Sequence, residues 1–360
     1  MELQTKDYVS FPLDARSGKY HFSLQAFDLS PDSAYFSFFN QLNSTLYVYN
    51  YGNQELERKI SFENEGADGI GNPGKIGHLV ISLDSIFLYN ASNFKLMLAN
   101  SRGEILKRIS VRTNDAGVYT PFADVRTLKP MVYRDNKVYL TGLKVGVEPI
   151  PDHTKFNNVI AVHLEQEEIE YPGLLKRSET YNEGQWGALH YYQLYPCYNS
   201  NTERFIYSFG IDHNVYETDH DNYIQSHIAK SRHFDKTVKP LAKNKDLSMA
   251  ELPVNKRTEY DFTTPSYYAI LYDASRNLYY RFVSPALTKE EYREKKPLSP
   301  VVMILDENFE TLGETSLPPQ GTYNYSMMFV NENGLHIMHD NGEEGKLHFV
   351  IFEPVKIEQI

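Results

Sequence analysis

Residues 264–285 read TPSYYAILYDASRNLYYRFVSP, and this stretch decides the fold class. It predicts two strands joined by the polar turn DASRN, because an apolar run lies on each side of that turn. Successive side chains of a strand point to opposite faces of the sheet. We therefore expect Tyr268 and Ile270 on one face and Tyr267 and Ala269 on the other, so that both faces are apolar. Such a sheet must be covered on both sides.

The composition favours a large, β-rich globular chain. The 360 residues are 41% hydrophobic and 23% charged, which is typical of a folded protein. The 28 tyrosines and 20 phenylalanines favour strands, where aromatic side chains pack well. The formal net charge of −11 repels phosphate backbones, so we expect no nucleic-acid partner. We interpret the one basic stretch, at 230–245, as a solvated loop.

Features that would cross-link the chain or insert it in a membrane are missing from the sequence. Cys197 is the only cysteine, which excludes an internal disulfide. No apolar run approaches the roughly 18 residues that a membrane-spanning helix needs. The first residues, MELQTKDYVS, lack the apolar core of a signal peptide. We therefore expect no transmembrane segment and no signal peptide in this chain.

Strand–turn–strand units recur along the whole chain. For example, LMLANSRGEILKRISV (96–111) and VMILDENFETLGETSL (302–317) have the same length, with a polar turn after an apolar run. Self-similar four-strand units predict a β-propeller, in which each blade packs face to face against two neighbours. We expect the third unit to open with the strand ADVRTLKP (123–130). The expected blades span approximately residues 20–62, 77–111, 119–172, 186–230, 264–317 and 323–355.

The last unit contains only three obvious strands. The segment DYVSFPLD (7–14) is strand-like and otherwise unattached, so we expect it to supply the outer strand of the final blade. The predicted fold class is all-β, a six-bladed β-propeller whose N-terminal strand closes the last blade, in a single domain over 1–360. A two-sheet β-sandwich is the main alternative. Helix is scarce, and the best candidate lies at 286–300, where Thr288 and Glu291 form a capping box.

No motif for catalysis, metal binding or cofactor binding is legible in the sequence. GIGNPG (69–74) matches G-x-G-x-x-G, but a strand follows where a dinucleotide site needs a helix, so we interpret it as a connection between blades. The spacing of His213, His220, His227 and His233 does not make them converge, and we interpret them as histidines on an outer edge. We therefore predict no catalytic residues, no metal ligands and no cofactor.

The loops that enter the first strands of the blades are the best candidates for a ligand site. Such strand starts meet at one end of a propeller, where aromatic rings can stack on a sugar or peptide and an arginine can bind a carboxylate or hydroxyl. The alternative is that Trp186, the only tryptophan, and Tyr191 fill the space between blades. The candidate ligand-binding residues are Trp186, Tyr119, Arg126, His190 and Tyr267.

Four segments of the chain resemble the "domain of unknown function 4221" family of Bacteroidetes. They are EGADGIGNPGKIGHLVISLDSIFL (65–88), HIAKSRHFD (227–235), SYYAILYDASRNLYYRFV (266–283) and PVVMILDENFETLGE (300–314). The resemblance implies a six-bladed propeller in the cell envelope, periplasmic or at the cell surface. It also implies a predicted lipoprotein, with a lipid anchor upstream of this chain. It implies no catalytic residues.

From fold and resemblance together we expect an extracytoplasmic, non-enzymatic propeller that binds a glycan or another envelope protein. The alternative is a propeller enzyme, lactonase-like or glycan-cleaving, with a divalent metal in the central channel. A third possibility is a scaffold that uses only its flat face and outer edges. Fold alone does not decide among these, because one fold carries many functions. An ion at the centre of the ring would favour the enzyme, and an aromatic-lined mouth would favour ligand binding.

Overall fold

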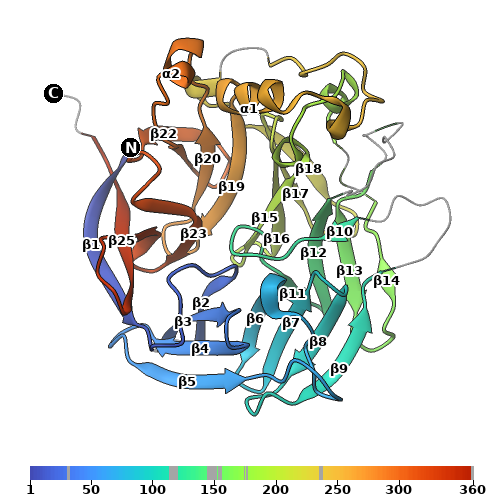
Figure 1. The fold of residues 1–360 in the computed structure, drawn as a ribbon, viewed down its shortest axis with the longest axis vertical. Coiled ribbons are helices and arrows are strands. Elements are labelled where there is room, and N and C mark those ends of the chain that lie inside the picture. Colours follow the sequence, from blue (N-terminus) through green and yellow to red (C-terminus); the bar gives the residue numbers. More distant parts are fainter. Residues whose placement is uncertain are drawn as a thin grey trace.

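The fold is a ring of six β-sheets around a common axis (Figure 1). The computed structural model describes residues 1–30, 33–112, 121–143, 152, 156–173, 175, 177–234 and 238–357. Most neighbouring blades touch through their first strands, whereas the third blade contacts the fourth through β12 (Lys137–Leu143). The chain is therefore a six-bladed β-propeller, as its repeated units predicted.

The blades follow one another along the chain. The first two contain β2 (Leu24–Ser30), β3 (Ser33–Asn40), β4 (Thr45–Asn50) and β5 (Leu56–Ser61), then β6 (Ile76–Ser82), β7 (Ser85–Asn90), β8 (Lys95–Ala99) and β9 (Ile105–Ser110). The third contains β10 (Phe122–Ala123), β11 (Val132–Arg134), β12 (Lys137–Leu143), β13 (Val159–His163) and β14 (Ile169–Glu170). The fourth contains β15 (Leu194–Asn199), β16 (Arg204–Phe209), β17 (Asn214–Thr218) and β18 (Ile224–Ile228). The fifth contains β19 (Ser266–Asp273), β20 (Leu278–Ser284), β21 (Val301–Leu305) and β22 (Thr311–Ser316).

The sixth blade joins the two ends of the chain. It contains β23 (Tyr323–Asn331), β24 (Gly334–His339), β25 (Lys346–Val355) and, as its outer strand, β1 (Glu2–Pro12). β1 pairs antiparallel with β25 from Glu2 opposite Val355 to Pro12 opposite Lys346, and the two strands lie side by side in Figure 1. The prediction that an N-terminal strand closes the last blade is confirmed, and that strand begins earlier than residue 7.

The hairpin of β19 and β20 is buried on both faces, as its sequence predicted. Tyr267 and Ile270 belong to a core cluster shared with the fourth blade, whereas Ala269 belongs to a cluster shared with the sixth. Strict alternation predicted Tyr268 beside Ile270, but a β-bulge leaves Tyr268 unpaired between Tyr267 and Ala269. The extra residue shifts the alternation, so Tyr267 takes the face expected for Tyr268.

Helices are few and lie in the connections. α2 (Lys289–Arg293) begins at Thr288 with the predicted capping box, whereas α1 (Val254–Thr263) was not predicted. In the part of the chain that the structure describes, no helix is long and apolar enough to span a membrane. The short 3-10 helices are η1 (Pro73–Lys75), η3 (Glu179–Asn182), η4 (Leu189–Tyr192), η5 (Arg232–Phe234) and η6 (Met249–Glu251).

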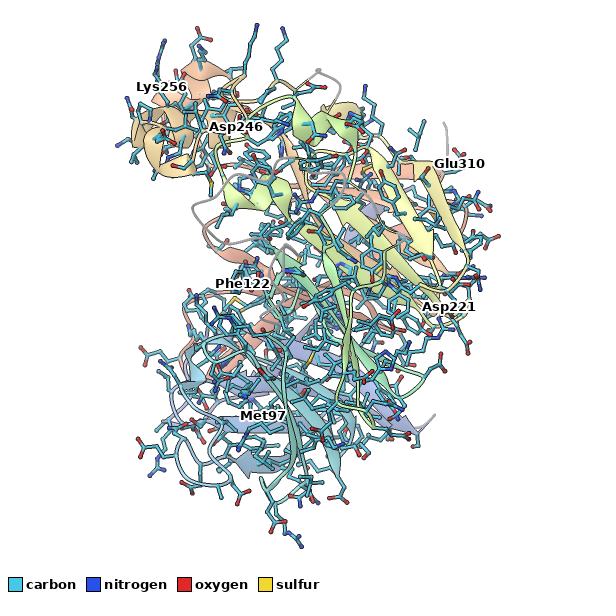
Figure 2. All side chains as sticks on the ribbon, turned by 90° about the vertical axis from the view of Figure 1, so that its right-hand side faces the viewer. Met97, Phe122, Asp221, Asp246, Lys256 and Glu310 are labelled. Atoms are coloured by element: carbon cyan, nitrogen blue, oxygen red, sulfur yellow. The ribbon has the colours of Figure 1, made fainter. Side chains whose placement is uncertain are left out.

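The two ends of the ring differ in their connections. We call the end at which the first strands begin the entry face. Asp246 and Lys256, which belong to the long connection into β19, lie at this end in Figure 2. Asp221 and Glu310, in tight turns between outer strands, lie at the opposite end. The long connections that carry α1 and α2 therefore gather on the entry face.

Candidate functional site

The first strand of the third blade is interrupted. β10 pairs with the end of β12 and β11 pairs with its beginning, whereas residues 124–131 leave the sheet between them. We call these residues the central turn, because Figure 1 shows them running from β10 into the middle of the ring. A continuous strand was predicted at 123–130, and this prediction is wrong. Pro130 cannot donate a ladder hydrogen bond, and Arg126 and Lys129 bond to each other across a tight turn instead.

The central turn contacts blades on several sides of the ring. The backbone N–H of Leu24 in the first blade donates to the Thr127 hydroxyl at 3.1 Å. Gly77 in the second blade leaves room for Val125, since a Cβ on Gly77 would lie 2.2 Å from the Val125 side chain. Leu128 is packed into the core cluster of the fifth and sixth blades. The turn therefore bridges the third blade to four others across the axis.

The central turn carries a buried ion cluster. Oδ2 of Asp124 accepts hydrogen bonds from Lys129 Nζ and pairs with Arg126 Nη2, each at 2.9 Å. The Lys129 side chain is only 2% exposed, and its burial lowers its pKa to about 8 against the opposing charge of Asp124. Burial by itself would raise the pKa of Asp124, but the charges of Lys129 and Arg126 outweigh it and leave that pKa below its usual value.

A cavity of about 490 Å³ opens on the entry face. It lies mainly against the first strands of the fifth and sixth blades and the end of α1. Its walls combine tyrosine rings and Phe262 with amide, carboxylate and hydroxyl groups. The residues that matter most below are Tyr20, His190, Asp261, Tyr268, Asn324 and Tyr325.

Both strands behind this cavity are irregular where they line it. Tyr268 is the bulged residue of β19, and in β23 the pairing skips Tyr325, Ser326 and Met327, between Asn324 and Met328. All of these skipped residues except Met327 line the cavity. The hydroxyl of Tyr268 is buried and has no hydrogen-bond partner among the described residues. A bulge changes the direction in which a side chain points. These two strands therefore direct toward the cavity some residues that a regular strand would keep between the blades.

The two carboxylates of the cavity wall have partners. Asp261 Oδ1 at the end of α1 lies 3.2 Å from His190 Nε2, and burial lowers the pKa of His190 although Asp261 opposes the shift. Asp340 accepts a hydrogen bond from Lys19 at 2.8 Å, which is the main reason that its pKa is lowered. The hydroxyl of Tyr20 donates to the same carboxylate at 3.2 Å. Asp340 is therefore balanced by a cation, whereas Asp261 faces a histidine whose charged form is disfavoured.

One sequence-predicted residue, His190, lies at this cavity, and a second, Arg126, is connected to it. His190 lines the cavity, and its backbone carbonyl accepts a hydrogen bond from the N–H of Gln193 at 3.2 Å. The side chain of Gln193 in turn accepts from Arg126 Nη2 at 2.9 Å. The Arg126 side chain is 35% exposed. Gln193 thus joins the rim of the cavity to the central turn.

Trp186 and Tyr267, which were also predicted, lie in the core and not at the cavity. Trp186 is 0% exposed and packs with Tyr191 in the core cluster of the third and fourth blades, so its ring offers no surface to a ligand. Tyr267 is also 0% exposed, with the guanidinium of Arg281 3.5 Å above its ring. Tyr119 lies outside the described residues. The positions of Trp186 and Tyr191 match the alternative that these two rings fill the space between blades.

Several residues of the site were missed by sequence reasoning. Asp124 and Lys129 belong to ADVRTLKP, which was expected to be an inner strand. Charged residues in such a strand were a usable signal of a buried ion cluster, because charges are seldom buried without partners. Tyr268 and Tyr325 had no such signal, since nothing in an apolar run marks the position of a bulge. His220, expected on an outer edge, is 8% exposed and bonds the hydroxyl of Tyr207 at 2.7 Å.

The described residues contain no cluster of metal ligands. Within them, no three His, Cys, Asp or Glu side chains are close enough together to hold a metal ion. The histidines at 213, 220, 227 and 233 accordingly form no such group. The chemistry that the site offers is hydrogen bonding, aromatic stacking and charge from the central turn.

Comparisons with known proteins agree with the fold. The family model described as "Domain of unknown function (DUF4221)" matches residues 1–316. A member of that family from Bacteroides vulgatus is similar in structure, with a TM-score of 0.78 and 24% identity over 98% of this chain and 97% of that chain. A proposed exported protein from Bacteroides fragilis has a TM-score of 0.56 and 10% identity over 98% of this chain and 96% of that chain. No curated protein is similar enough to count as a relative.

Proposed function

The chain belongs to the DUF4221 family, and we propose that it is a non-enzymatic propeller of the bacterial cell envelope that holds a small glycan in the entry-face cavity. The envelope location is supported by the likeness to a proposed exported protein of the same fold. The ligand class is supported by the size and chemistry of the cavity.

The cavity has the dimensions of a small-molecule site. Its volume of about 490 Å³ falls within the roughly 300–1,000 Å³ that ligand pockets occupy. A sugar has an apolar ring face and a rim of hydroxyl groups, so it needs aromatic surface together with hydrogen-bonding side chains. Tyr20 and Phe262, which are 63% and 40% exposed, and the half-buried Tyr268 provide the first, and Asn324 and Asp261 provide the second. A purely apolar ligand would leave these polar groups unpaired.

The observation that carries this proposal is the irregularity of the inner strands at the cavity. Bulges interrupt the ladder and are common beside functional sites, where they redirect a side chain. Here β19 and β23 are both irregular, at Tyr268 and at Tyr325 and Ser326, and these residues all line the cavity. The buried Tyr268 hydroxyl, which has no partner in the described part of the chain, is then available to a ligand hydroxyl.

Isothermal titration calorimetry with a panel of bacterial and host oligosaccharides tests the proposal. We expect the wild-type protein to bind at least one of them, and Tyr268→Ala to weaken that binding about tenfold or more, as truncation of an aromatic anchor does. Tyr8→Ala is the matched control, because Tyr8 is 64% exposed in β1 and lies outside the cavity. Wild-type protein that binds no member of the panel, or binding that Tyr268→Ala leaves unchanged, would contradict the proposal.

A further inference from the structure

We propose that the glycan carries a carboxylate and that Arg126, on the central turn, recognises it. This inference rests on the proposed function and makes it more specific: the ligand is a sugar acid, such as a uronic or sialic acid residue. Four observations carry it, namely the unused donor of Arg126, the excess positive charge at the turn, the contacts that join the turn to the cavity, and the geometry of arginine–carboxylate recognition.

The Arg126 side chain is held in place, but not all of its N–H groups have an acceptor. Its Nη2 bonds Asp124 and Gln193, each at 2.9 Å, which fixes the plane of the guanidinium. Its Nε is buried and has no hydrogen-bond partner among the described residues. A buried donor without a partner is costly, so a site that contains one favours a ligand or water that can accept from it. The Arg126 side chain as a whole is 35% exposed, so part of it lies at the surface.

The central turn carries more positive than negative charge. Asp124 is paired with both Arg126 and Lys129, and Lys75 of η1 is close enough to help lower the pKa of the same carboxyl. Three cations therefore act on one carboxylate. Of the two carboxylates of the cavity wall, Asp340 is balanced by Lys19, whereas Asp261 faces His190, whose pKa is lowered. In a chain with a net charge of −11, the central turn is therefore a local positive site. Its partly buried position strengthens its attraction for an anion.

Two chains of contacts join the central turn to the cavity. The first runs from Arg126 through the Gln193 side chain to the backbone of His190, which lines the cavity. The second begins at Lys129, whose Nζ lies 5.8 Å from the centre of the Tyr195 ring. Tyr195 in turn acts electrostatically on Tyr268 of the cavity wall. No residue of the central turn lines the cavity itself, so the ligand that we propose extends from the cavity past His190 toward Gln193 and Arg126.

The chemistry of the two parts is complementary to a sugar acid. A guanidinium binds a carboxylate with parallel N–H···O bonds, stronger than those between neutral groups. The tyrosines of the cavity provide stacking surface for the sugar ring. A neutral sugar would bond to the polar groups of the cavity but would leave the positive charge of the turn without an anionic partner. Lys129 is a positioning residue in this arrangement, because it holds Asp124 and not the ligand.

A paired glycan array tests the inference. Each glycan ending in a uronic or sialic acid is printed beside its methyl ester, which keeps the ring and removes the charge. We expect the wild-type protein to prefer at least one acid over its ester about tenfold or more, and Arg126→Gln to bind both equally. We also expect the preference to decrease as the salt concentration rises. Arg102→Gln, at a side chain that is 75% exposed in an outer turn, is the control and keeps the preference.

The outcomes separate this inference from the proposed function. Equal binding of acids and esters by the wild type would overturn the inference and leave the glycan site standing. A preference for acids that survives in Arg126→Gln would overturn the assignment to Arg126. No binding of any glycan would overturn the proposed function itself. If Arg126→Gln does not fold, Lys75→Gln removes an exposed charge near Asp124, and it should weaken the acid preference about twofold or more while ester binding stays unchanged.

Discussion

The hydroxyl of Thr127 accepts a hydrogen bond from the backbone N–H of Leu24 at 3.1 Å, which joins the third blade to the first across the axis of the ring. Blades of a propeller otherwise contact mainly the blades next to them. The residues at the centre of this ring therefore have a structural role, since the central turn ties distant blades together. They also have the role in ligand recognition that we propose, because the same turn presents Arg126.

The packing of the central turn can be tested at Leu128. Its side chain is 8% exposed in the core cluster of the fifth and sixth blades. Leu128→Ala should lower the free energy of unfolding by roughly 2–4 kcal/mol, because it leaves a cavity in a packed cluster. Leu42→Ala, at a side chain that is 78% exposed, should change it by less than about 0.5 kcal/mol. Urea denaturation measures both, and a Leu128 effect below about 1 kcal/mol would show that the turn is not part of the cooperative core.

The buried charge of Lys129 predicts a stability that rises with pH. The folded-state pKa is about 8, below the value of 10.4 in an unfolded chain, so above pH 8 the unfolded chain binds a proton that the folded chain does not. The free energy of unfolding of the wild type should therefore rise relative to Lys129→Met by about 2 kcal/mol between pH 8 and pH 9.5. Denaturant titrations at several pH values measure this difference. A difference that stays constant with pH would mean that Lys129 titrates normally.

Buried histidines predict a loss of stability in acid. Burial lowers the pKa of His21 to about 4, and of His78 and His336 to about 3. Unfolded histidine has a pKa near 6.5, so below that pH the unfolded chain binds protons that the folded chain does not, and stability falls as pH falls toward 4. We expect the melting temperature to fall steeply between pH 6 and pH 4. Thermal unfolding monitored by circular dichroism at several pH values measures this fall.

The same prediction has a variant that isolates one histidine. His336 bonds the hydroxyl of Tyr51, so His336→Gln should cost stability at neutral pH but should weaken the acid dependence. The slope of the unfolding free energy below about pH 6 should decrease by about 1.4 kcal/mol per pH unit. An unchanged slope would show that His336 does not contribute to acid sensitivity.

Closure of the ring by β1 can be tested on alternating residues of that strand. Phe11 is 0% exposed and stacks on Phe36 of the first blade, whereas the ring of Tyr8 is 64% exposed. Phe11→Ala should lower the free energy of unfolding by roughly 3–5 kcal/mol, and Tyr8→Ala by less than about 0.5 kcal/mol. Deletion of residues 1–14 should expose the edge of β25 and cause aggregation, which light scattering detects. A soluble, monomeric and folded deletion variant would show that β1 does not close the ring.

The local pattern of the sequence was enough to predict the architecture. The apolar faces of residues 266–284 required neighbours on both sides, and repeated units with an unattached N-terminal strand indicated a closed ring. The capping box at Thr288 and Glu291 was also predictable, since it depends on residues three positions apart. Patterns of this kind determine structure through neighbours along the chain, where the side-chain period is fixed by the backbone.

The candidate site depended on relationships that the sequence does not encode locally. Arg126 and His190 were predicted as separate candidates, but only the folded chain joins them through Gln193, and only the folded chain buries Trp186 and Tyr267. The bulge at Tyr268 likewise becomes visible only in the pairing of β19 with β20. Sequence by itself determined the number and character of the blades, because hydrophobic periodicity is a local property. Tertiary structure decided which side chains face the mouth of the ring, because that depends on contacts between residues far apart in the chain.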